Sequence, residues 1–469
     1  MPAGSDAGWR RPSLAWLAPA VLMQFTVEVG PLAYVQDEAK QYYGDDGGFA
    51  WSLALSARGL ISVFVSPLLG ALSDRWGRKP NQAWKAGFSV LPMVPLALGM
   101  VGPWRVPLTL ILVGVQGLSG AQFACAISYC ADLMMEDGGG RRLKNTIARM
   151  LSLTFTPAFI FGPQAVNALF EYGGRDFMWR VVFFTGVVNV FYSLLVMPES
   201  LGVRRSLAET PMSAMARRAS DASPAFHLDE PQGWRALNPL RHLRLLSLKG
   251  PAGPDVTRVL RLACGVTFFL YFSKMSLIAM VMIFAELRWG WPTAKTAWLT
   301  GTWGVSQFIS MSALSMTDRG RAEPARGGTE RAISWIGLWS ALIGMVLMSI
   351  MWVDWLMLPA LFTGAVSMIT YAALGSYCGR VTDVSMNGEV QALLGIMIDL
   401  SQVLGPPLAG ALLKWGMSLE HVSKVLPNLP FMVGTLPVLI AMALHRRLPT
   451  MEEAYQLRGK VPAREPLQA

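Results

Sequence analysis

The sequence predicts an all-α membrane protein with twelve transmembrane helices arranged as two bundles of six. Three observations support this fold class. Of the 469 residues, 53% are hydrophobic and only 15% are charged, a balance that the cores of water-soluble domains of this length do not bury. Apolar stretches long enough to cross a bilayer recur along the chain. Basic residues gather in alternate connections between these stretches.

Each predicted crossing needs about 20 apolar residues, because a helix satisfies its own backbone hydrogen bonds where lipid offers no partner. The stretches that meet this requirement are 13–36, 49–71, 82–102, 106–130, 147–170, 179–197, 260–285, 296–316, 332–351, 356–378, 390–413 and 426–444. A long polar interval divides them six and six. Secondary transporters are commonly built from such repeated bundles, which rock about a site near the middle of the membrane.

The 40 Lys and Arg residues give a net charge of +10, and their placement decides between a membrane and a nucleic-acid partner. With the N-terminus inside, only eight fall in the outer connections: Lys40, Arg105, Arg175, Arg180, Arg288, Lys295, Lys414 and Lys424. Two more lie inside predicted helices, and the others follow the side of the N-terminus. This positive-inside pattern predicts that both termini and the central loop are cytoplasmic. We therefore expect a lipid bilayer and no nucleic acid as partner.

The domain boundaries follow from the same stretches. We expect a cytoplasmic N-terminus over 1–12, a first bundle over 13–198, a cytoplasmic linker over 199–257, a second bundle over 258–446 and a cytoplasmic tail over 447–469. The linker segment 238–246 has helical spacing of Leu against Arg, which fits either a helix on the inner membrane surface or a solvated loop. A monomer is expected, and nothing in the sequence selects a plasma or an organelle membrane.

The charged loop between the second and third predicted helices reads Gly70-Ala-Leu-Ser-Asp74-Arg75-Trp-Gly77-Arg78-Lys79. Gly70 is expected to permit close helix packing, and Gly77 a tight reversal. Asp74 lies near helix ends, where a carboxylate accepts hydrogen bonds from backbone or Arg. The basic residues Arg75, Arg78 and Lys79 hold the loop on the cytoplasmic side.

This loop resembles the signature between helices two and three of the major facilitator superfamily, Gly-x-Leu-Ala-Asp-Arg-x-Gly-Arg-Lys, at nearly every defined position. The chain is most similar to the tetracycline-efflux-like branch and its hippocampus-abundant-transcript-like relatives, through Ser128-Tyr-Cys-Ala-Asp132, Pro198-Glu-Ser200 and Leu404-Gly-Pro-Pro-Leu-Ala-Gly410. The resemblance implies two bundles that latch and release through Asp74 and its neighbouring Arg residues. It also implies a transporter rather than an enzyme.

Two departures from the family pattern bear on the transport mode. The antiporter signature in helix five has Gly-Pro followed by a Gly pair, whereas here Gly162-Pro163 is followed by Gln164-Ala-Val-Asn167. Proton-linked members often carry an Arg three residues before Gln-Gly in helix four, where this chain has Val113. The resemblance therefore leaves proton antiport and other modes open.

Four ionisable residues lie inside predicted helices: Glu28, Arg58, Lys274 and Asp399. A charge near the bilayer centre costs at least ~2.5 kcal/mol, so such residues pair, line a wet cavity or act in function. One hypothesis makes Glu28 the acid that exchanges protons or contacts the solute, and the alternative pairs it with Lys274 or Arg58 merely to tolerate burial. A second hypothesis joins Arg58 and Asp399 in an ion pair between the bundles that opens during transport. Its alternative is that Asp399 faces cytoplasmic water.

Neutral polar and aromatic residues complete the predicted cavity. Gln24 lies four residues before Glu28, on the same helical face, and is the favoured hydrogen-bonding partner of a solute. Trp303 and Phe308 either stack on an aromatic solute or pack between helices. The four cysteines show no ligand spacing, and no phosphate-binding loop with Lys and Ser or Thr occurs. We therefore expect no metal, no cofactor and no ATP-driven pump.

These features predict a secondary active transporter that moves a small organic solute by alternating access, with proton-coupled export as the leading mode. One alternative is a facilitative or symport carrier for a nutrient or metabolite. Another is a transporter-derived sensor that binds solute and signals through the linker.

Overall fold

The computed structural model describes residues 12–120, 124–136, 150–200, 246–247, 254–316, 329–382, 387–450 and 453. Every regular element in these ranges is a helix, as the sequence predicts. Most of the predicted linker and cytoplasmic tail, including 238–245 of the Leu-Arg segment, lies outside the described residues.

The first group of helices precedes the linker. It comprises α1 (Leu14–Val29), α2 (Leu32–Tyr43), α3 (Gly47–Trp76), α4 (Arg78–Val90), α5 (Val94–Ala97), α6 (Arg105–Val115), α7 (Ala124–Glu136) and α9 (Phe155–Phe191). The helical hydrogen bonding is interrupted between α1 and α2 at Gly30-Pro31, because a proline has no N–H to continue it. Gly174, with φ of +76°, bends α9 into two helical arms.

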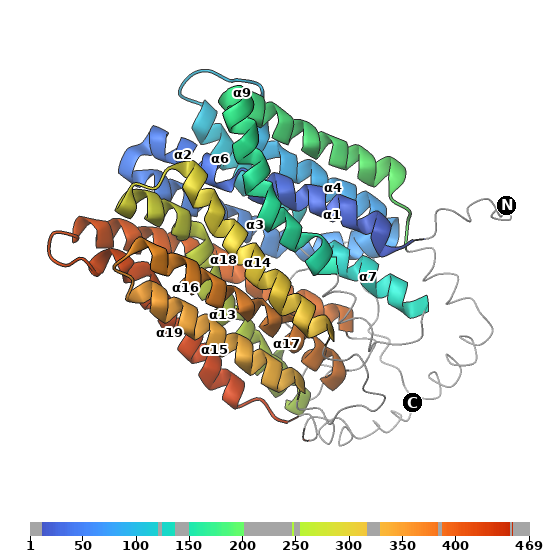
Figure 1. The fold of residues 1–469 in the computed structure, drawn as a ribbon. Coiled ribbons are helices and arrows are strands. Elements are labelled where there is room, and N and C mark those ends of the chain that lie inside the picture. Colours follow the sequence, from blue (N-terminus) through green and yellow to red (C-terminus); the bar gives the residue numbers. More distant parts are fainter. Residues whose placement is uncertain are drawn as a thin grey trace, which may run out of the picture.

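The second group follows the linker. It comprises α13 (Pro254–Trp289), α14 (Thr293–Met316), α15 (Thr329–Ser349), α16 (Met357–Ala365), α17 (Ile369–Val381), α18 (Asn387–Ser418) and α19 (Leu429–Arg446). In Figure 1 these helices, coloured yellow to red, lie on one side of the molecule, and those of the first group lie on the other.

Seven helical segments of the described residues are long and apolar enough to cross a membrane. Two of them, 14–70 and 150–196, have 57 and 47 residues, more than one crossing requires. Many large apolar side chains are exposed, including Phe64, Phe161, Phe184, Ile309 and Leu436. Lipid would cover such a surface, and the chain is an integral, multi-pass membrane protein.

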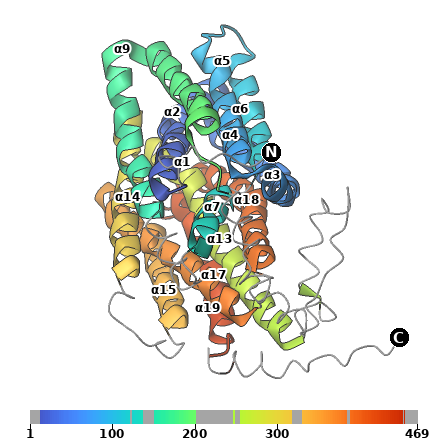
Figure 2. The same ribbon diagram turned by 90° about the vertical axis from the view of Figure 1, so that its right-hand side faces the viewer.

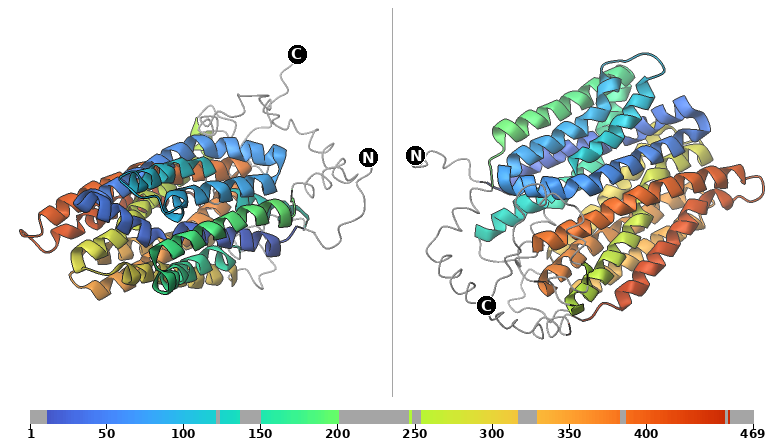
Figure 3. Two further views of the ribbon diagram at one scale, coloured as in Figure 1. Left: turned by 90° about the horizontal axis from the view of Figure 1, so that it is seen from above. Right: turned by 180° about the vertical axis from the view of Figure 1, so that it is seen from behind.

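The two most extensive helix crossings between the groups involve α3 and α9 of the first group. α3 packs along α18, and α9 packs along α14. Figure 2 shows these two pairs at opposite edges of the molecule, and the rear view in Figure 3 shows α18 beside α3. A Cβ on Gly59 of α3 would lie 3.0 Å from the Asp399 carbonyl oxygen and the Val403 nitrogen of α18. A Cβ on Gly304 of α14 would lie 3.0 Å from the Ile160 nitrogen. Glycine therefore sets how closely the backbones approach at both crossings.

Candidate transport site

Glu28, on α1, is the centre of a buried polar network. Its side chain is 4% exposed, and its Oε2 pairs with Arg58 Nη2 of α3 at 3.2 Å. Its Oε1 accepts hydrogen bonds from Ser89 Oγ at 2.6 Å and from Gln24 Nε2 at 3.1 Å. Of the two pairings considered for this acid, the structure contains the one with Arg58 and not the one with Lys274. Gln24 lies beside Glu28, as helical phase predicts.

One face of α4 supplies further members of this network that the sequence analysis did not identify. Gln82 Nε2 donates to Gln24 Oε1 at 2.9 Å. Lys85 is buried one turn further along and interacts electrostatically with Glu28 and Asp399. Ser89 follows after another turn. The available sequence signal was the spacing of three and four residues, which places these side chains on one helical face.

Asp399, on α18, connects the two groups of helices through hydroxyls. The residue is 6% exposed, and its Oδ2 accepts hydrogen bonds from Ser62 Oγ at 2.8 Å and Ser66 Oγ at 3.0 Å, both on α3. The hypothesised ion pair with Arg58 is therefore not formed, because Arg58 is turned to Glu28 while Asp399 faces the serines one and two turns further along α3. The alternative in which Asp399 faces water is also wrong, since the carboxylate is buried.

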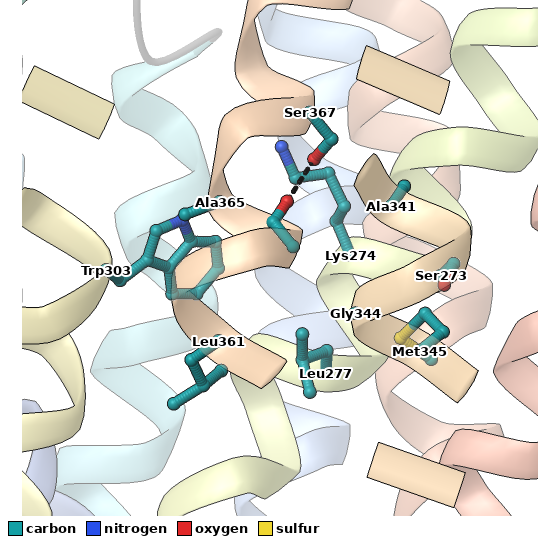
Figure 4. Close-up of a pocket in the computed structure, with 11 residues that line it drawn as sticks. Ser273, Lys274, Leu277, Trp303, Ala341, Gly344, Met345, Leu361, Ala365 and Ser367 are labelled. Atoms are coloured by element: carbon teal, nitrogen blue, oxygen red, sulfur yellow. Dashed lines mark hydrogen bonds between the residues drawn. The ribbon is translucent and has the colours of Figure 1, made fainter. Parts of the chain in front are cut away.

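Lys274, in the middle of α13, lies apart from that network. The residue is 5% exposed and lines a small cavity between α13, α14, α15 and α16 (Figure 4). Trp303 borders the same cavity, whereas Phe308 is 47% exposed and does not line it. Of the two aromatic residues considered for stacking on a solute, Trp303 therefore borders this cavity and Phe308 does not.

The loop 70–79 contains a reversal that only glycine accommodates. Gly77 has φ of +114°, a backbone conformation that residues with a side chain rarely adopt. The carboxylate of Glu199 lies directly over it, accepting hydrogen bonds from the backbone nitrogens of Arg78 at 2.8 Å and Lys79 at 3.1 Å. A carboxylate in this position satisfies free N–H groups at the start of α4. The tight turn expected at Gly77 is confirmed.

The described side-chain contacts of this loop stay within the first group of helices. Arg78 Nε pairs with Asp132 Oδ2 of α7 at 2.9 Å. The reason given for Gly70 is wrong, because a Cβ there would meet no atom of the described residues within 4 Å, so close packing against them does not require glycine. The side chains of Asp74 and Arg75 lie outside the described part, so the latch between the groups remains a prediction.

We predict that Gly77→Ala will be strongly destabilising and Gly70→Ala nearly silent. The added Cβ at Gly77 would lie 2.1 Å from Glu199 Oε2 and would also oppose the positive φ, for a combined cost of about 1–3 kcal/mol. Thermal unfolding of the purified protein in detergent measures the difference. Equal unfolding temperatures for the two variants would contradict this account of the loop.

Gly162 and Pro163, on α9, lie where this helix crosses α1. The Cβ position of Gly162 is 3.6 Å from Gly30 Cα, and a Cβ on Gly30 would lie 2.9 Å from Val166 Cγ2. The pair of glycines therefore allows close contact between α1, which carries Glu28, and α9. This role is one of packing and does not itself indicate the direction of transport.

Comparison with known proteins agrees with this arrangement. Human hippocampus abundant transcript-like protein 1 (Homo sapiens) is 22% identical over 421 residues, covering 86% of this chain and 74% of the relative. The class C tetracycline resistance protein of Escherichia coli is 22% identical over 365 residues, covering 77% of this chain and 79% of the relative. The structure of the human organic anion transporter MFSD10 (TETRAN) superposes with a TM-score of 0.63 at 15% identity, covering 92% of this chain and 98% of that one.

The chain has the fold of a major facilitator superfamily transporter. The similarity to the tetracycline-efflux-like and hippocampus-abundant-transcript-like proteins that the loop motif predicted is confirmed. No protein-family profile matches the chain. The solved structures that share this fold are those of an organic anion transporter and of proton-dependent oligopeptide transporters.

Proposed function

We propose that this major facilitator chain is a secondary transporter with twelve crossings in two six-helix bundles, and that it exports a small organic solute in exchange for protons. The observation that carries the proposal is the position of Asp399. This buried carboxylate on α18 bonds to Ser62 and Ser66 on α3, so its state of protonation bears directly on how the two groups of helices hold together.

Asp399 is better suited than Glu28 to take up a proton. Protonating Glu28 would leave Arg58 as a buried cation without its ion-pair partner, and a broken buried pair is strongly unfavourable. The described hydrogen-bond donors of Asp399 are neutral hydroxyls, so protonating it breaks no described ion pair and loses only the longer-range attraction of Arg58 and Lys85. The Glu28–Arg58 pair then joins α1 to α3 while Asp399 carries the coupling proton.

Ion pairs at the predicted outer ends support alternating access. Lys40 of α2 pairs with Glu286 of α13 at 3.7 Å, and Lys414 of α18 pairs with Asp46 just before α3. Each joins the first group of helices to the second. Opening towards the outside would require both to separate, so they are suited to hold the outer side closed.

The names of the relatives favour export of an organic solute. Tetracycline resistance proteins of two bacterial species align with more than three quarters of this chain. Lowering the internal concentration of a drug is one way to resist it, and an exporter achieves this. We therefore take drug-like or metabolite-like organic molecules as the solute class.

Proton exchange can be measured in liposomes that contain the purified protein and a pH-sensitive dye. With tetracycline and benzoate as test solutes, a pH step should drive solute against its gradient, and solute should in turn move protons. We expect Asp399→Asn to abolish this coupling while facilitated equilibration persists. Glu28→Gln should reduce the rate and leave its pH dependence in place.

The controls separate the alternatives. Asp354→Asn removes an exposed carboxylate that pairs with Lys295 and should behave as the wild type. If the wild type equilibrates solute at a rate that does not depend on pH, the protein is a facilitative carrier. Coupling that survives Asp399→Asn would refute the assignment of the proton to this residue.

A further inference from the structure

Three residues that line the cavity beside α13 carry a buried polar group without a described partner. Lys274 Nζ, Ser273 Oγ and Trp303 Nε1 are buried, and none has a hydrogen-bond partner among the described residues. All three residues line the same cavity. In Figure 4 the Lys274 side chain extends towards Ser367, and Trp303 borders the cavity from α14. Buried polar groups in native structures are normally satisfied, so such a cluster indicates a missing partner.

The missing partner is an acceptor of hydrogen bonds with negative charge. The ammonium, hydroxyl and indole groups are all donors, and Lys has no acceptor capacity. In the described ranges, no charged side chain interacts with Lys274. Its Nζ lies 5.3 Å from the centroid of the Tyr271 ring. The charges of Glu28, Arg58, Lys85 and Asp399 balance one another in the other network. Lys274 is therefore a buried cation in need of an anion.

We propose that this cavity binds the carboxylate, or an equivalent small oxyanion, of an organic anion that the transporter carries. The cavity is small, with room for about one or two water molecules, so it admits at most a small headgroup and not a whole solute. Lys274 supplies the charge, and the Trp303 indole supplies a further hydrogen bond, whereas Ser273 lies on the far side of the cavity beside Met345 (Figure 4). The assignment rests on the proposed transport function, because it names the class of solute.

The anion subsite is also connected to the proposed proton site. The Tyr271 ring lies 5.9 Å from the Tyr371 ring, and Tyr371 interacts electrostatically with Asp399. Two adjoining aromatic residues, Tyr271 and Tyr371, therefore lie between Lys274 and Asp399.

The test is binding of small carboxylates to the full-length purified protein, measured by thermal shift in detergent. Acetate and benzoate should raise the unfolding temperature of the wild type, whereas the neutral, shape-matched acetamide and benzamide should not. Lys274→Gln should weaken benzoate binding by roughly 10- to 100-fold, because a charge-assisted hydrogen bond is lost. Lys274→Arg should retain binding, and Lys295→Gln, which removes an exposed lysine on α14, should match the wild type.

Several outcomes would overturn the subsite. Equal effects of benzoate and benzamide on the unfolding temperature of the wild type would overturn the subsite, and this comparison needs no variant. Chloride protecting the protein as well as acetate does would indicate a resident halide instead of a solute headgroup. Solute flux driven by pH together with no carboxylate binding would reject the anion class and leave transport standing. Lys274-dependent benzoate binding without flux would support the subsite and reject the transport function.

Discussion

Replacing Arg58 with leucine should abolish transport and lower the stability of the protein more than any other single change in the buried polar network around Glu28. The substitution leaves Glu28 as a buried carboxylate with hydrogen bonds from Ser89 and Gln24 and no Arg58 partner. Breaking a buried pair in this way costs about 3–5 kcal/mol. Each 1.4 kcal/mol by which the folded, transport-competent state is destabilised lowers its equilibrium constant about tenfold. We therefore expect solute flux in liposomes to fall at least about tenfold. The unfolding temperature in detergent should fall in parallel.

The double variant Glu28→Gln with Arg58→Leu separates folding from function. Removing both charges leaves no uncompensated ion, so most of the lost stability should return. Gln at position 28 retains the hydrogen-bonding capacity that Ser89 and Gln24 use. If the double variant also recovers full flux, the ion pair serves burial only. An Arg58→Leu protein with normal stability would refute the pairing itself.

Replacing Gly59 with valine should stop the rocking of the two groups of helices. A Cβ at this position lies 3.0 Å from two backbone atoms of α18, and the branched side chain adds further atoms. Backbone cannot yield as a flexible side chain does, so α3 and α18 must separate, at a cost of about 1–3 kcal/mol. Separation would also stretch the hydrogen bonds of Ser62 and Ser66 to Asp399. We expect flux to fall at least about tenfold through the loss of this contact.

The neighbouring residue provides the matched control. Leu60 is 50% exposed, so Leu60→Val introduces the same side chain one position along on the outer face of α3. This variant should retain flux and unfolding temperature within experimental error. Normal flux from Gly59→Val would show that the α3–α18 crossing is not part of the transport cycle.

Several site residues could be predicted because their signal is local. Glu28, Arg58, Lys274 and Asp399 are ionisable residues within apolar stretches, and each is expensive to bury unless it has a purpose. Gly77 was predicted to turn because glycine permits a tight reversal of the backbone. The pairing of Glu28 could be narrowed to two basic residues and no further, since composition does not say which helix faces which.

The partners of Asp399 and the unpaired state of Lys274 could not be predicted. Ser62 lies 337 residues from Asp399 in the chain, and a serine inside a helix looks like any other small polar residue. Lys85 and Gln82 stand at the start of a predicted helix, where basic and polar residues commonly mark the membrane surface. The structure instead buries both against α1 and α18.

The sequence by itself determined that the chain is helical, that it inserts in a membrane and that it resembles major facilitator transporters. These properties depend on local quantities: the length of apolar stretches, the cost of unsatisfied backbone groups and the order of residues in one loop. Only the tertiary structure decided that Arg58 pairs with Glu28, that serines hold Asp399 and that Lys274 lines its own cavity. Those outcomes depend on the rotation and depth of each helix against its neighbours, which glycine contacts such as Gly59 against α18 set in space.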